Sequence, residues 1–215
     1  MSRISTQAIG IATAIAALTP ATPALAAEED TQFWGFFEVE APLGPNARAG
    51  LEISPRFAEG PDSMETRLLV EFDVADGVEL GGGLVHGAFP GANELRPFQQ
   101  VELKTGPFES RTRLEQRFFD GADRTEWRVR QRLLVSHPIA PDWDISGDVE
   151  LFYVLRDRDP SREAAVDNWR FTLAADHAVN DKLSVGLGYM LMLSPNGPAE
   201  SEISHVPQVS VKYSL

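Results

Sequence analysis

The chain contains no cysteine, only three lysines and, beyond its first 27 residues, nothing that resembles a transmembrane helix. Without cysteine there are no disulfides and no lipoprotein anchor, so a sheet network, a core or a membrane must hold an exported chain. The three lysines leave 16 arginines among the 19 basic residues. Arginine binds carboxylates through a planar fork and suits a crowded ionic interior better than a solvated surface. The net charge of −13 disfavours nucleic acid as a partner.

Residues 1–27 have the pattern of a cleaved secretory signal peptide. Arg3 gives a short positive start, an uncharged stretch follows, and Ala24 and Ala26 are the small residues that a cleavage site requires. A single N-terminal membrane anchor is the weaker alternative because the stretch is only modestly hydrophobic. We therefore predict an exported protein in which residues 28–215 form a single domain, since about 190 residues are enough for one domain and not comfortably for two.

The most regular pattern lies in residues 108–118 and 126–135. Charged side chains occupy almost every second position there, and the positions between them are mostly apolar or uncharged. This period of two is that of a β-strand, in which successive side chains point to opposite faces. A soluble sandwich would leave the charged face in water. In a membrane barrel, the apolar face meets lipid and the charged face lines a wet interior.

Nine further segments alternate in the same way, which makes eleven predicted strands. Short turns such as Asp76-Gly77 alternate with generally longer, more polar loops, of which residues 156–167 are the longest. Aromatic residues gather near the strand ends, as in the interfacial girdles of membrane proteins. These signals favour an all-β, antiparallel, up-and-down transmembrane β-barrel of about 10–12 strands. Twelve is preferred because single-chain bacterial barrels usually have an even number.

The C-terminus agrees with a location in the cell outer membrane. The amphipathic segment Val211–Leu215 resembles the C-terminal assembly signal of bacterial outer-membrane proteins, although a terminal phenylalanine would be more typical than Leu215. We therefore predict two partners, the outer-membrane lipid and the outer-membrane assembly machinery, the latter acting through the last strand.

Two neighbouring motifs carry a family resemblance. Residues 111–118 (RTRLEQRF) and 127–133 (WRVRQRL), followed by Pro138, resemble the most recognisable part of the bacterial DUF2490 family, and the segment 183–189 (LSVGLGY) is also similar. Members of this family are taken to be small outer-membrane β-barrels without an established activity. The resemblance therefore implies a fold and a location, and it supplies no catalytic residue.

In a barrel, the alternating segments would place a network of arginines and carboxylates in the lumen. Small barrels fill their interiors with side chains, so the network could be purely structural. It could also line a narrow, porin-like pore for small anionic solutes, since arginine rings attract anions. Both interpretations stay open from the sequence. The predicted lumen network comprises Arg111, Arg113, Arg117, Arg128, Arg130, Arg132, Glu102, Glu109, Glu115, Glu126, Asp148 and Glu150.

Signals for an enzyme are weak. The four histidines, His86, His137, His177 and His205, are scattered without metal-ligand spacing. We therefore predict no catalytic residue, no cofactor and no metal site. Two alternatives remain: an outer-membrane lipid hydrolase that uses Ser136 and His137, or His177, on the barrel exterior, and a soluble periplasmic β-sandwich binding protein.

Overall fold

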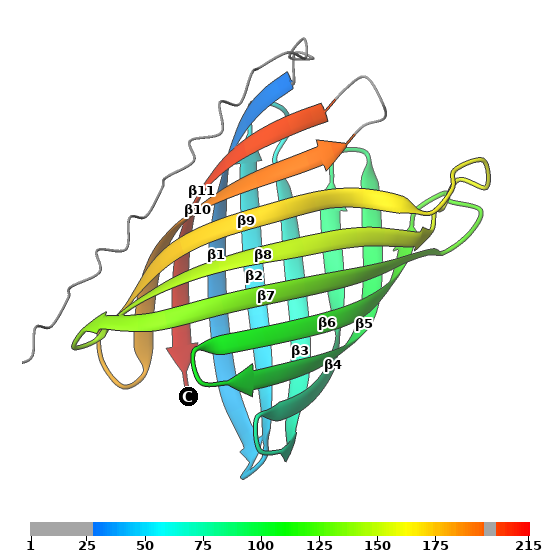
Figure 1. The fold of residues 1–215 in the computed structure, drawn as a ribbon. Coiled ribbons are helices and arrows are strands. Elements are labelled where there is room, and N and C mark those ends of the chain that lie inside the picture. Colours follow the sequence, from blue (N-terminus) through cyan, green and yellow to red (C-terminus); the bar gives the residue numbers. More distant parts are fainter. Residues whose placement is uncertain (1–27, 196–200) are drawn as a thin grey trace, which may run out of the picture.

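The computed structural model describes residues 28–195 and 201–215, which form eleven strands arranged as one closed barrel (Figure 1). Consecutive strands pair antiparallel, and the first strand closes the ring against the last. The predicted all-β, up-and-down barrel is therefore confirmed. The signal peptide predicted for residues 1–27 lies outside the described residues. The strands are β1 (Glu28–Gly44), β2 (Ala47–Ala58), β3 (Ser63–Ala75), β4 (Val78–Phe89), β5 (Ala92–Thr105), β6 (Phe108–Phe119), β7 (Glu126–Ala140), β8 (Trp143–Arg156), β9 (Ala165–Ala178), β10 (Leu183–Pro195) and β11 (Ser201–Ser214).

The strand number lies in the predicted range, but the preference for twelve is wrong for the described residues. All eleven segments counted in the sequence are strands, and β1, with 17 residues, is the longest. In an up-and-down barrel, an odd number of strands sends the first and the last in the same direction. β1 and β11 therefore pair in parallel, from Glu28 with Glu202 to Glu40 with Ser214. We call this parallel pair the seam.

The distribution of side chains is inverted relative to a soluble protein. Among the described residues, thirteen polar or charged residues are buried, but only seven hydrophobic ones. Large hydrophobic side chains point outward instead, led by Leu173 and Leu187, which are each 71% exposed. The two-residue alternation produces this inversion because it sends neighbouring side chains to opposite faces of the wall. A closed barrel with an apolar outer surface excludes the two-sheet soluble sandwich. The described part of the chain contains no helix long and apolar enough to cross a membrane.

Aromatic side chains lie near the ends of the outward apolar band. Phe108 and Phe118 are close to the two ends of β6, while Trp143 and Trp169 are close to the beginnings of β8 and β9. All four are between 38% and 57% exposed. Exposed aromatic side chains near the strand ends are typical of the girdles that anchor membrane proteins at the two membrane–water interfaces.

The two rims of the barrel have different connections. At the rim that holds Leu215, four of the five connections contain two residues each, whereas residues 157–164 connect β8 to β9 at the opposite rim. Gly77 shows why the short turns need particular residues: its φ is +67°, and a Cβ there would lie 2.4 Å from the backbone oxygen of Lys104. This asymmetry is the one that short periplasmic turns and longer extracellular loops produce.

The long β8–β9 loop, whose role the sequence left open, packs against the loop between β6 and β7. Arg124 donates hydrogen bonds to the backbone oxygens of Asp157 and Asp159, at 2.6 and 3.1 Å. The guanidinium of Arg158 lies 4.1 Å from the centre of the Phe119 ring. These contacts fasten the loop to its neighbour at the rim.

The apolar part of the interior lies beside the seam. Trp34 on β1, Met190 on β10 and Val206 on β11 form a small buried cluster, and Phe36 packs against it. The opposite wall, formed by β5 to β8, carries most of the predicted charged residues. The buried apolar cluster therefore lies beside the seam, and the predicted charged residues lie across the lumen from it.

Candidate functional site in the barrel lumen

The twelve residues of the predicted lumen network lie at inward-facing positions of four consecutive strands, β5 to β8. Ten of them take part in ion pairs or charge-assisted hydrogen bonds within the wall, as described below. The other two lie nearer the rim of short turns. Glu102 pairs with Lys104 at 3.0 Å, and Glu109 forms no ion pair within residues 28–195 and 201–215.

The register of β6 and β7 places like charges directly opposite one another. Arg111 faces Arg132, and Arg113 faces Arg130. Such pairs are destabilising unless other groups neutralise them. The next strand, β8, supplies two carboxylates. Asp148 lies 2.9 Å from Arg132, and Glu150 forms ion pairs with both Arg111 and Arg130. Carboxylates on β8 thus offset the repulsion between arginines on β6 and β7.

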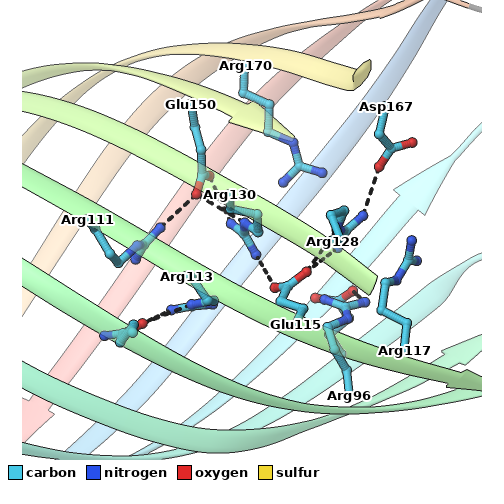
Figure 2. Close-up of polar contacts among 12 residues, drawn as sticks. Arg96, Arg111, Arg113, Glu115, Arg117, Arg128, Arg130, Glu150, Asp167 and Arg170 are labelled. Carbon is cyan, nitrogen blue, oxygen red and sulfur yellow. Dashed lines mark hydrogen bonds and ion pairs between the residues drawn. The ribbon is translucent and has the colours of Figure 1, made fainter. Parts of the chain in front are cut away.

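A continuous chain of ion pairs runs along this wall (Figure 2). Glu150 accepts from Arg111 at 3.0 Å and from Arg130 at 2.8 Å. Arg130 also contacts Glu115 at 3.1 Å, and Glu115 accepts from Arg128 at 2.7 Å. Glu115 is 0% exposed, and each of its carboxylate oxygens contacts a guanidinium. Because each carboxylate serves two arginines, the positions of the charged groups depend on one another.

A second chain of ion pairs extends from β6 toward β3. Glu94 accepts from Arg96 at 2.7 Å and from Arg117 at 2.6 Å, and Arg117 reaches Glu126 at 2.5 Å. Arg96 also contacts Glu65 on β3 at 3.1 Å. Sequence reasoning left Glu65, Glu94 and Arg96 out of the network, although they stand at inward positions of the same two-residue alternation.

A cavity of about 350 Å³ lies in the middle of the lumen. Nine arginines but only four carboxylates line it, together with aromatic and neutral side chains from several strands. Part of the excess positive charge is balanced by carboxylates set behind the arginines, such as Glu94 and Glu115. The charged lining residues are Arg56, Arg67, Arg96, Arg111, Arg117, Arg128, Arg130, Arg132, Arg170, Glu52, Glu65, Asp148 and Glu150.

Two inward arginines of the described strands have no carboxylate within 4.0 Å. Arg113 is 1% exposed, and its Nε and Nη2 both donate to Gln100 Oε1, at 2.8 and 2.6 Å. Arg170 on β9 lines the cavity, and its only side-chain hydrogen bond to a described residue goes from Nε to Asn168 Oδ1 at 3.1 Å. In Figure 2, Arg170 reaches inward beside Glu150 and Arg130 without an ion pair.

Aromatic rings take the place of a counterion for Arg170. Its guanidinium carbon lies 4.2 Å from the centre of the Phe152 ring and 5.1 Å from that of Trp34. Cation–π contacts of this kind hold the flat face of a guanidinium and leave its N–H edge free. Sequence reasoning missed Arg170. The available signal was that its inward neighbours on β9, Asn168 and Thr172, carry no charge.

The arrangement on the outer surface speaks against the catalytic pair considered from the sequence. Ser136 and His137 are consecutive in β7, so one points into the barrel and the other outward. The ring of His177 is stacked on Trp143 at 4.6 Å, and its Nδ1 lies 3.0 Å from the backbone oxygen of Asp142. Among the described residues, no group of three histidine or acidic side chains is placed to hold a metal ion.

The chain matches the model of a family described as protein of unknown function (DUF2490) over residues 31–199. It is 28% identical over 171 residues to an uncharacterised protein of Methylorubrum extorquens, with 72% of this chain and 75% of that protein covered. Among solved structures, the NanC porin is similar, with a TM-score of 0.56, 12% identity and coverage of 83% of this chain and 91% of the porin chain. At that identity the likeness shows the fold alone.

Proposed function

Because the chain belongs to the DUF2490 family and folds as a porin-like barrel, we propose that it is an outer-membrane channel whose narrow lumen passes small anionic solutes. The family has no assigned activity, so the proposal depends on the lumen of this chain. We infer a pore and not an enzyme, because the ordered charges face the lumen and the outward histidines form no recognisable catalytic group.

The observation that carries this proposal is the imbalance of charge around the central cavity. Nine arginines and four carboxylates line it. Rings of arginine in a pore attract anions and repel cations, and the low dielectric constant of a narrow lumen strengthens both effects. Arg170 contributes a positive charge that no carboxylate within 4.0 Å neutralises. The lumen should therefore favour anions although the chain as a whole carries a net charge of −13.

The proposed location is the cell outer membrane. A closed barrel with an outward apolar band and a porin as structural neighbour fits that location. We infer export by the leader at residues 1–27, contact of the outer band with lipid, and recognition of the end of β11 by the assembly machinery. Each of these remains a proposal that rests on sequence pattern.

A second candidate is a purely structural barrel whose network plugs the lumen. The burial of its charges favours it: Arg113, Glu94 and Glu115 are each at most 1% exposed. Side chains fixed this firmly would block the passage of solutes beyond the central cavity. Conductance separates the two candidates, because both predict a stable, heat-modifiable barrel and only one predicts a current.

The test is single-channel recording of the detergent-folded protein in a planar bilayer, after heat-modifiable gel migration has shown that it is folded. Under a KCl gradient we expect a steady current whose reversal potential has the sign of an anion-selective pore. Arg170→Gln should move the reversal potential toward zero, because it removes a lumen charge without leaving a carboxylate unpaired.

The matched control is Arg162→Gln, in the exposed β8–β9 loop. It makes the same change in net charge away from the lumen, so its reversal potential should equal that of the wild type. A folded barrel without current would leave the structural candidate standing. Cation selectivity of the wild type would also refute the anion pore.

A further inference from the structure

Arg170 differs from the other arginines of the cavity in how it is held. The other eight lining arginines each have a carboxylate partner within 4.0 Å. Arg170 lies on Phe152 and beside Trp34, rings that Arg130 and Arg56 also contact, but among the described residues it has no carboxylate partner. Its Nε is occupied by Asn168, and no described side chain accepts from Nη1 or Nη2.

The position of Arg170 in the sheet makes this lack of a partner informative. Glu150 is its direct cross-strand neighbour in the β8–β9 register. Both oxygens of Glu150 are nevertheless used by other arginines, Oε1 by Arg111 and Oε2 by Arg130. Glu150 therefore pairs with two guanidiniums and leaves the third neighbouring guanidinium, that of Arg170, without an ion pair among the described residues. An anion entering the cavity would complete the charge balance at this point.

Arg113 serves as an internal comparison. It also lacks a carboxylate and also lies on a ring, 4.2 Å from the centre of Phe98. Its Nε and Nη2 both donate hydrogen bonds to Gln100, and the residue is 1% exposed. Arg113 is therefore closed off inside the wall, whereas Arg170 presents its terminal nitrogens to the cavity. Of the two, only Arg170 can receive a ligand.

The free edge of a guanidinium favours oxyanions over chloride. Two parallel N–H groups match the two oxygens of a carboxylate, whereas a chloride ion meets them only as a point charge. Thr172 and Gln208, which line the same cavity, add hydrogen-bonding groups on the seam side. The cavity, at about 350 Å³, is at the lower end of the size range of ligand pockets, roughly 300–1,000 Å³.

From these observations we propose that Arg170, held by Phe152 and Trp34, is a binding site for a small carboxylate inside the lumen. The inference rests on the proposed anion pore for the route by which the ligand enters, and it adds the class of solute. The planar fork of Arg170 binds both oxygens of the carboxylate, so a positive charge without the fork would not reproduce the binding.

The experiment compares acetate with chloride in two assays. The first measures the reversal potential with acetate on one side of the bilayer and chloride on the other, which gives their permeability ratio. The second measures equilibrium binding to the detergent-folded protein through tryptophan fluorescence, because Trp34 lies beside Arg170. Arg170→Lys keeps the positive charge but loses the fork and the stacking geometry.

We expect wild-type protein to bind acetate more tightly than chloride, and Arg170→Lys to lose this preference by about tenfold while it stays selective for anions over cations. Arg162→Lys, in the exposed loop, should behave as wild type. Trp143→Phe, which removes an outward tryptophan away from the cavity, should leave the acetate-induced fluorescence change in place. These results together identify the fork at Arg170 as the recognition element.

Failure of this inference is distinguishable from failure of the pore. An anion-selective current with equal responses to acetate and chloride, or an unchanged preference in Arg170→Lys, overturns the carboxylate site and leaves the pore. Binding of acetate without any current overturns the pore and keeps the site. Inorganic phosphate binding at least as tightly as acetate, in an Arg170-dependent manner, overturns the assignment to carboxylates.

Discussion

Replacing Glu115 with glutamine removes one negative charge from the most enclosed point of the ion-pair chain. Glu115 Oε2 accepts from Arg128 at 2.7 Å, and Oε1 accepts from Arg130 at 3.1 Å. The amide of glutamine has nearly the same shape, but its NH₂ group would face donors and cannot accept from them. Two buried guanidiniums would then have lost their shared counterion.

The size of the effect follows from this burial. Removing one partner of a buried ion pair costs about 3–5 kcal/mol when the remaining charge is left unpaired. Arg130 keeps Glu150 and Arg128 keeps Asp167 as partners, so we expect the lower end of this range, about 3 kcal/mol. The matched control is Glu40→Gln near the rim, where Glu40 and its partner Lys212 have side chains that are 23% and 43% exposed. An exposed pair of this kind contributes only about 0–1 kcal/mol.

Urea unfolding of the protein in lipid vesicles, followed by tryptophan fluorescence and heat-modifiable migration, measures both variants. With a slope of about 2 kcal/mol per molar urea, Glu115→Gln should lower the midpoint by about 1.5 M and Glu40→Gln by less than about 0.5 M. The double variant Glu115→Gln/Arg128→Gln should cost less than the sum of its single variants, because the two residues contact each other.

Equal, small shifts for Glu115→Gln and Glu40→Gln would refute the reasoning. They would mean that water reaches the Glu115 carboxylate and that the ion-pair chain does not stabilise the wall. The same result would weaken the structural candidate for the lumen, since a plug depends on rigid pairing.

Three further variants test other parts of the fold. Gly83→Ala should cost about 1–3 kcal/mol in urea unfolding, because a Cβ there would lie 2.0 Å from the Leu68 backbone oxygen, whereas Gly50→Ala, whose Cβ meets nothing closer than 3.5 Å, should be tolerated. Leu173→Arg should lower the free energy of unfolding in vesicles by about 2–4 kcal/mol if the outer face meets lipid, whereas Leu43→Arg, beside a turn, should have little effect. Asp142→Val should cost about 1–2 kcal/mol in the same unfolding assay, because residue 142 has a φ of +62° that a β-branched side chain resists.

The wall of the barrel could be predicted from the sequence because alternation acts locally. Along β6, each inward residue is separated from the next by one outward residue, so both faces follow from the chain itself. The strand number could not be settled in the same way. The even count came from a general preference, and the parallel pairing of β1 with β11 joins segments at opposite ends of the sequence.

The ion-pair partner of each charged residue could not be predicted from the sequence, for a related reason. Arg111 reaches past β7 to Glu150 on β8, and Arg96 reaches past β4 to Glu65 on β3. Such contacts depend on strand register, side-chain length and curvature of the wall together. Arg170 was missed because it stands alone on a strand without a run of alternating charges, and its significance comes from what its neighbours lack.

The seam has a consequence for the order in which the barrel is made. Ten of the eleven strand pairs join segments that follow each other in sequence, so each of these pairs can form as a local hairpin. The pairing of β1 with β11 needs the whole chain, because it joins residues far apart in sequence, such as Trp34 and Gln208. Parallel pairing is also slightly less stable per residue than antiparallel pairing. We therefore expect the barrel to close at the seam in its last step.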